Sequence, residues 1–156
     1  MWLNGLALNK FIKMIKPQQK ILKYFTSEEI KWALKREAHD FFLPKCFIEL
    51  IDETFTREWV YNGATGVKDK YYPNLFSWVH DYLWITGAGG KESDLIMRYL
   101  VDSKYGDSGE ARLFYIGVRL AWFGFYKWKH KFKGNKRELT EVERECYNKA
   151  RLFYGK

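Results

Sequence analysis

The sequence predicts a mainly α fold: a compact single domain of six or seven helices with one long irregular loop at about residues 62–73. Apolar residues recur at helical spacing along most of the chain. N-cap patterns such as Ser27-Glu-Glu and Thr140-Glu-Val-Glu precede some of these runs, and glycines or prolines separate them. With 156 residues, the chain is long enough to bury a core within one domain.

Residues 1–17 are expected to form a basic amphipathic arm ahead of a single helical domain of residues 18–156. Apolar side chains alternate with lysines at helical spacing from about Leu6 to Ile15, and Pro17 ends the pattern. One interpretation is a helix that docks on the domain. The other is an arm that binds a membrane surface, nucleic acid or a neighbouring subunit.

N-cap residues and helix-breaking prolines indicate where the next helices begin and end. Ser27 is expected to be the N-cap of a helix that stops before Pro44. Helical spacing continues from Cys46 to about Val60, although residues 54–61 also fit a strand. The following loop, at about residues 62–73, is of a length that often carries function in a compact domain.

The second half of the chain reads as four further helices. The first starts at Pro73-Asn74 and ends at Gly87, and the second covers Lys91 to about Lys104. A long helix is expected from about 107 to 132, and a final one from Thr140 to about Tyr154.

Composition narrows the class of partner. Aromatic residues make up 19% of the chain, which indicates a core or an interface built on rings. The net charge of +8 favours anionic partners, namely nucleic acid, a lipid surface or an acidic protein. Two cysteines, Cys46 and Cys146, are too few for a disulfide scaffold and wrongly spaced for a zinc site, which favours a reducing compartment.

One group of polar residues predicts chemistry. On a helix over residues 74–86, His80 falls on a largely apolar face, and Asp94 at the start of the next helix can bind its second nitrogen. In a hydrolase, His80 would deprotonate water and Asp94 would fix its tautomer. Asp81 would then hold a calcium ion, with backbone carbonyls from Gly63 and Gly66 as further ligands.

A structural alternative explains the same residues. His80 and Asp94 can simply join two helices, while Asp81 pairs with one of the arginines further along the chain. The candidates for that pairing are Arg98, Arg112 and Arg119. Both interpretations stay open at the level of the sequence.

The same residues resemble the calcium-dependent secreted phospholipases, which carry a glycine-rich calcium loop, a His-Asp helix and a later orienting Asp. The matching segments are Tyr61-x-Gly63-x-x-Gly66, His80-Asp81-Tyr82-Leu83-Trp84 and Asp94. The resemblance implies that His80 is the base, Asp81 a calcium ligand and Asp94 the orienting acid. The chain departs from that family at Trp84, where a Tyr is expected, in its wider glycine spacing and in its lack of supporting disulfides.

The second half of the chain also resembles a bacteriophage-encoded family of unknown function, which has His-Asp-x-Leu-Tyr and late Tyr-x-x-Val-Arg motifs. The matching segments are His80-Asp81-Tyr82-Leu83-Trp84, Ser93-Asp94 and Tyr115-Ile116-Gly117-Val118-Arg119. The Thr-Asp-x-Ala-Ser-x-Pro segment of that family is missing, so the resemblance covers about 50 of the 156 residues. It implies a phage origin, often near tail or lysis genes.

A second basic segment, 127–137, interleaves lysines with aromatic residues, a pattern that suits contact with nucleic acid or a membrane and equally a solvated helix end. Together these patterns predict a virion-associated structural or assembly protein of a phage, at the head–tail junction, in the tail or packaged. It would be made in the host cytoplasm and act by contact with other virion proteins, as a symmetric assembly in one version. The alternative is a calcium-dependent, phospholipase-like hydrolase that uses the His80-Asp81 helix.

Overall fold

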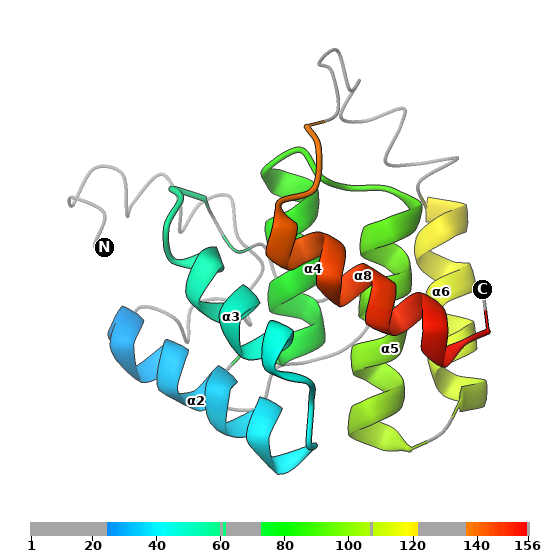
Figure 1. Ribbon diagram of the computed structural model, residues 1–156, viewed down its shortest axis with the longest axis horizontal. Helices are drawn as coiled ribbons and strands as arrows, with labels where there is room; N and C mark the ends of the chain where they lie inside the picture. The colour runs from blue at the N-terminus through cyan, green and yellow to red at the C-terminus, as the bar shows by residue number, and fades with distance from the viewer. Residues whose placement is uncertain (1–24, 60, 62–72, 107, 122–136, 156) are drawn as a thin grey trace.

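The structure is a computed structural model that describes residues 25–59, 61, 73–106, 108–121 and 137–155 (Figure 1). This part confirms the mainly α prediction: it contains helices and no strand. The predicted arm, 1–17, and most of the predicted loop, 62–73, lie outside it. The helices are α2 (Ser27–Asp40), α3 (Lys45–Thr54), α4 (Leu75–Ile85), α5 (Lys91–Tyr105), α6 (Ser108–Ala121) and α8 (Glu141–Phe153).

Local side-chain chemistry sets the helix ends, with two differences from prediction. The N-cap of α2 is Thr26 rather than Ser27, because the Thr26 hydroxyl accepts the Glu29 N–H at 3.0 Å and completes a capping box. Helix α3 ends at Thr54, well before the predicted Val60. Thr140 caps α8 as predicted, and its hydroxyl accepts the Glu143 N–H at 3.2 Å.

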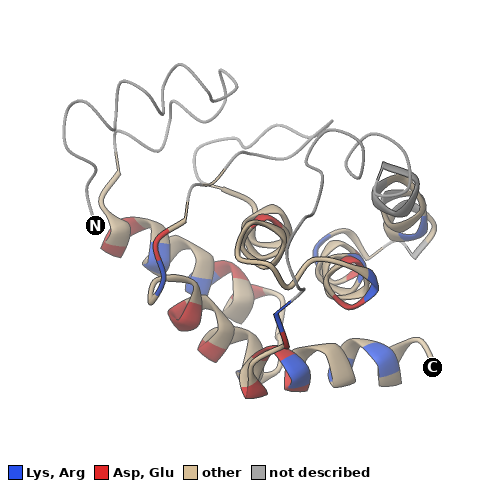
Figure 2. Ribbon diagram, turned by 90° about the horizontal axis from the view of Figure 1, so that it is seen from above, with Lys and Arg blue, Asp and Glu red and all other residues tan. Residues whose placement is uncertain are grey.

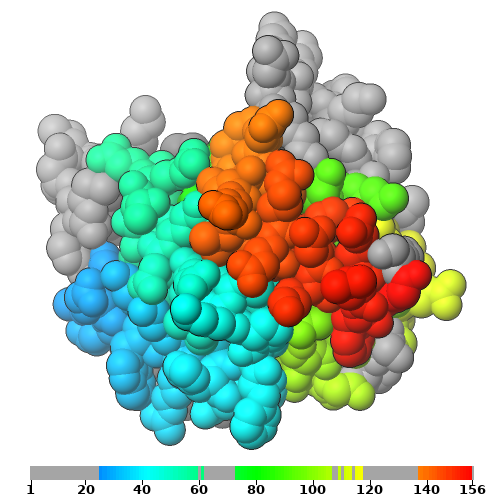
Figure 3. Space-filling model, in the orientation of Figure 1, coloured from blue at the N-terminus to red at the C-terminus, as the bar shows by residue number. Residues whose placement is uncertain are grey.

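Helix α4 forms the centre of the domain. Nine of its eleven residues are buried, as expected of a helix that is apolar on nearly every side. Helix α5 packs beside it, while α8 lies across α3 and α5 (Figures 1 and 2). In the space-filling view, α2, α3 and α8 cover this face of the molecule and leave little of α4 visible (Figure 3).

Aromatic rings fill much of the space between α3 and α4. The Trp59 ring lies 4.7 Å from that of Trp78 and 5.5 Å from that of Tyr82, centroid to centroid. The Trp78 indole N–H donates to the Thr54 hydroxyl at 2.8 Å. Many of the aromatic residues therefore pack in the core. The high aromatic content by itself is no longer a reason to expect a protein interface.

The two cysteines meet where α3 packs against α8. Cys46 and Cys146 are both buried, free thiols. A hydrogen bond from Cys146 lowers the pKa of Cys46, and burial raises the pKa of Cys146. Among the described helices, none is long and apolar enough to cross a membrane.

Candidate functional site

The structure brings His80 and Asp94 together. Nε2 of His80, on α4, lies 2.8 Å from Oδ1 of Asp94, on the first turn of α5. The Asp94 side chain is fully buried, whereas that of His80 keeps 17% of its surface exposed. With Nε2 held by a carboxylate, Nδ1 is the nitrogen left for water or a substrate, an arrangement that suits both a general base and a helix clasp.

The sequence did not single out a second donor to Asp94. The Trp84 indole N–H donates to the same Oδ1 atom at 3.1 Å, so His80 and Trp84, one turn apart on α4, share one carboxylate oxygen. The signal was present, because Trp84 is the residue at which the chain departs from the phospholipase pattern. Here we call His80, Trp84 and Asp94 the Asp94 cluster.

The turn between α4 and α5 is shaped around this cluster. Gly87 and Gly90 have positive φ angles of 95° and 141°, which L side chains rarely adopt. A Cβ atom at Gly89 would lie 2.3 Å from Cδ2 of Trp84, so only glycine leaves room for the indole ring there. Gly90 then caps α5, whose positive N-terminal dipole favours a carboxylate at Asp94.

The proposed calcium ligands are not brought together in the described part of the chain. Asp81 is buried on α4, but Gly63 and Gly66 lie outside the described residues. Within the described residues, no three His, Cys, Asp or Glu side chains are placed to hold a metal ion. Of the three arginines suggested as partners of Asp81, Arg98 lies over the rings of Tyr154 and Tyr115. The metal role of Asp81 and the catalytic roles of His80 and Asp94 stay predictions.

A second buried carboxylate was missed. Glu143, on α8, is fully buried and accepts two hydrogen bonds from the Arg137 guanidinium, each of 2.8 Å. Arg137 also donates to the carbonyl and the hydroxyl oxygen of Thr86, at 2.9 and 2.8 Å. The hydrogen bonds to Glu143 raise the pKa of Arg137. This Glu143 cluster therefore fastens the start of α8 to the end of α4.

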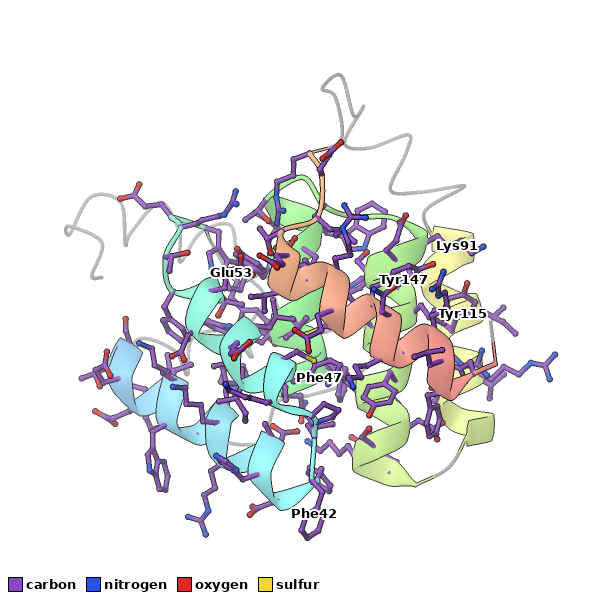
Figure 4. The ribbon with its side chains drawn as sticks, viewed as in Figure 1. Phe42, Phe47, Glu53, Lys91, Tyr115 and Tyr147 are labelled. Atoms are coloured by element: carbon purple, nitrogen blue, oxygen red, sulfur yellow. The ribbon has the colours of Figure 1, made fainter. Side chains whose placement is uncertain are left out.

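Two further ionisable groups adjoin the Glu143 cluster. Glu53, beside the first turn of α8 in Figure 4, accepts the Thr140 hydroxyl at 3.0 Å. Burial raises the pKa of Glu53 and raises that of Tyr82 to about 12. The Tyr82 hydroxyl is buried and finds no hydrogen-bond partner among the described residues. The visible signal was Thr140-x-x-Glu143, which predicted the cap without indicating the arginine.

Comparison of the chain with protein-family models, with curated proteins and with solved structures found no match.

Proposed function

We propose that this chain is a virion-associated structural or assembly protein of a bacteriophage that acts by protein–protein contact. The motif resemblance over residues 79–126 supports the phage origin. The observation that carries the mode of action is Phe42, whose side chain is 92% exposed on a backbone with a φ of +54°.

Phe42 follows the C-terminal end of α2 in a position that glycine usually occupies. Its N–H donates to the His39 carbonyl and the next N–H, of Leu43, to the Ala38 carbonyl, both at 3.0 Å. This pair of bonds forms a Schellman motif, which requires a left-handed residue. A non-glycine residue there costs about 1–2 kcal/mol, and the exposed ring returns little packing energy to the domain.

Phe42 therefore serves the fold poorly and suits contact with another molecule. In Figure 4 its ring extends beyond the lower end of α2. Single exposed apolar residues are common, and most of the eight large ones in the described part carry no argument alone. Two neighbours at the end of α8, Leu152 and Phe153, are also exposed and make a second apolar surface.

The proposed partners are other virion proteins, in a symmetric assembly or in contact with unlike subunits. The two basic segments, 1–17 and 127–137, are proposed to contact nucleic acid or a membrane. Apart from Arg137 they lie outside the described residues, so their support is the sequence: residues 1–24 hold five lysines and no acidic residue. The proposed location is the virion, after synthesis in the host cytoplasm.

The test is quantitative mass spectrometry of purified particles of the encoding phage, with the wild type and two variants. Phe42→Asn suits the left-handed backbone and should keep or raise stability while it lowers the copy number per particle. Phe42→Tyr keeps the ring and should be incorporated normally. Absence of the wild-type chain from purified particles would contradict the proposal.

The 2.8 Å contact between His80 and Asp94 favours a second candidate, the calcium-dependent phospholipase-like hydrolase. In it His80 is the base, Asp94 orients it and Asp81 binds Ca²⁺. Calcium titration, with thermal melting and turnover of a fluorescent phospholipid followed together, separates the two proposals. A hydrolase would be stabilised by calcium and would turn over lipid, and Asp81→Asn would abolish both effects.

A further inference from the structure

Arg98, on α5, has a side chain without an ion-pair partner among the described residues. Its Nε atom is buried and has no hydrogen-bond partner in that part of the chain. Among the ion pairs of the described residues, none includes Arg98, although other half-buried cations such as Arg137 and Lys104 have carboxylate partners. A guanidinium with an unmatched charge and unused donors is an anion-binding group.

Two tyrosines hold the guanidinium in place. Its carbon atom lies 4.0 Å from the centroid of the Tyr154 ring, at the end of α8, and 5.6 Å from that of Tyr115, on α6. Tyr115 is labelled in Figure 4, beside the C-terminal half of α8 in that view. Two acids lie one turn from Arg98 along α5. Asp94 is bound by His80 and Trp84, and Asp102 accepts the Tyr154 hydroxyl at 3.3 Å. The rings thus hold a guanidinium that forms no ion pair with a carboxylate of the described residues.

Apolar surface continues directly from this point. The Phe153 ring lies 4.9 Å from that of Tyr154, and the Phe153 side chain is 62% exposed. We define the Arg98 slot as Arg98, Tyr115, Phe153 and Tyr154. It combines an arginine, two tyrosines and an apolar border, which are the residue types enriched at the centres of protein interfaces.

We propose that the Arg98 slot binds an Asp or Glu carboxylate carried by an apolar segment of a partner protein. The inference rests on the proposed function, because it names the chemistry of the partner that the virion protein would contact. The guanidinium fork matches a carboxylate with two hydrogen bonds, and the exposed Phe153 ring can cover the apolar neighbours of that carboxylate. A nucleic-acid backbone fits less well, since phosphate-binding sites gather several cations and this slot has one among rings.

The test uses the full chain labelled with ¹⁵N at arginine and two capped tripeptides, acetyl-Leu-Glu-Leu-amide and acetyl-Leu-Gln-Leu-amide. At millimolar concentrations, the Glu peptide should shift the Arg98 Nε–H resonance in a saturable manner, and the Gln peptide should not. Arg98→Lys should bind at least about tenfold more weakly than wild type, because it keeps the charge and loses the fork. Phe153→Ser should weaken binding about fivefold, equivalent to about 1 kcal/mol.

Leu113→Ser is the matched control, since Leu113 is 71% exposed on α6 and lies outside the slot. It should bind the Glu peptide as the wild type does. Equal shifts from both peptides, or none from either, would overturn the inference, as would a larger saturable shift from inorganic phosphate. Peptide binding by a chain absent from particles would contradict the virion proposal alone. If the chain is present in particles but its slot does not bind the peptide, only the slot proposal is contradicted.

Discussion

Two fully buried carboxylates, Asp94 and Glu143, hold helix ends in this domain, and they differ in what they bind. Glu143 faces a guanidinium that stays charged at any ordinary pH, through two hydrogen bonds of 2.8 Å. Asp94 faces an imidazole, which can gain or lose a proton, and an indole N–H. The pairing of Glu143 with Arg137 suits a permanent connection between helices. The pairing of Asp94 with His80 keeps a partly exposed, titratable side chain at the surface.

A buried carboxylate beside a histidine does not by itself indicate catalysis. Both clusters connect the C-terminal half of α4 to the start of another helix. Glu143 does so from α8 through Arg137 and Thr86, and Asp94 does so from α5 through His80 and Trp84. The geometry of the Glu143 cluster indicates a structural role. The loss of stability when Glu143 is changed can therefore be compared with the loss when Asp94 is changed.

The largest expected effect is at Glu143. Glu143→Gln keeps the size of the side chain and leaves Arg137 without its charge partner, so the free energy of unfolding should fall by about 3 kcal/mol. Urea denaturation measures it. The exposed neighbour Glu145 provides the control, because Glu145→Gln should change stability by less than about 0.5 kcal/mol. Equal losses of stability in the two variants would show that the contact between Glu143 and Arg137 does not stabilise the fold.

The next effect is at the turn that holds the Asp94 cluster. Gly89→Ala places a Cβ atom against the Trp84 ring, and the free energy of unfolding should fall by about 1–3 kcal/mol. Gly117→Ala, on an exposed part of α6 with nothing within 4 Å of the new atom, should be neutral or stabilise by up to about 1 kcal/mol. Thermal melting of the two variants separates steric conflict from the general effect of adding a methyl group.

Asp94→Asn tests the second carboxylate. It should cost about 1–2 kcal/mol, less than Glu143→Gln, because the imidazole and the indole that bind Asp94 carry no permanent charge, unlike the Arg137 guanidinium. Urea denaturation of both variants in one buffer measures the difference. A loss at Asp94 as large as that at Glu143 would mean that the two clusters are equivalent fastenings.

The smallest effect at neutral pH is expected at Tyr82, which borders the Glu143 cluster. Tyr82→Phe removes a buried hydroxyl that has no hydrogen-bond partner in the described part of the chain, so stability at pH 7 should stay the same or rise by about 1 kcal/mol. The pKa of Tyr82 is raised to about 12 in the folded chain, above the ordinary value of 10.

At alkaline pH, Tyr82→Phe should change how steeply stability depends on pH. Between pH 10 and 12 the unfolded chain loses the Tyr82 proton while the folded chain keeps it, so wild-type stability falls as pH rises through this window. Tyr82→Phe should make that fall less steep. Parallel slopes for the wild type and the variant, in urea denaturation from pH 9 to 11, would contradict the assignment.

Much of the fold follows from local patterns in the sequence. The Thr140-x-x-Glu143 cap and the glycine-bounded α4 were predicted because caps and helical spacing act within a few residues. The contact of His80 with Asp94 was predictable for the same reason, since a short turn brings neighbouring helices together. Thr26 was overlooked as the N-cap because Ser27 beside it offers equivalent chemistry.

The remaining contacts depend on packing between distant segments. Arg137 reaches Thr86 across 51 positions of the chain, and no local pattern pairs them. Arg98 was one of three arginines suggested as partners of Asp81, and no local pattern indicated that the end of α8 would place the Tyr154 ring against its guanidinium. The aromatic excess predicted a core or an interface equally well, and only the packed structure assigns Trp59, Trp78 and Tyr82 to the interior.

Two assays on the same preparations of the wild type and of His80→Gln decide between a structural and a catalytic Asp94 cluster. One assay measures incorporation into phage particles and the other measures calcium-dependent turnover of a fluorescent phospholipid. The account predicts normal incorporation of the folded variant, and no turnover by either protein. Calcium-dependent turnover by the wild type that disappears in a folded His80→Gln variant would contradict it, and would make the Asp94 cluster an active site.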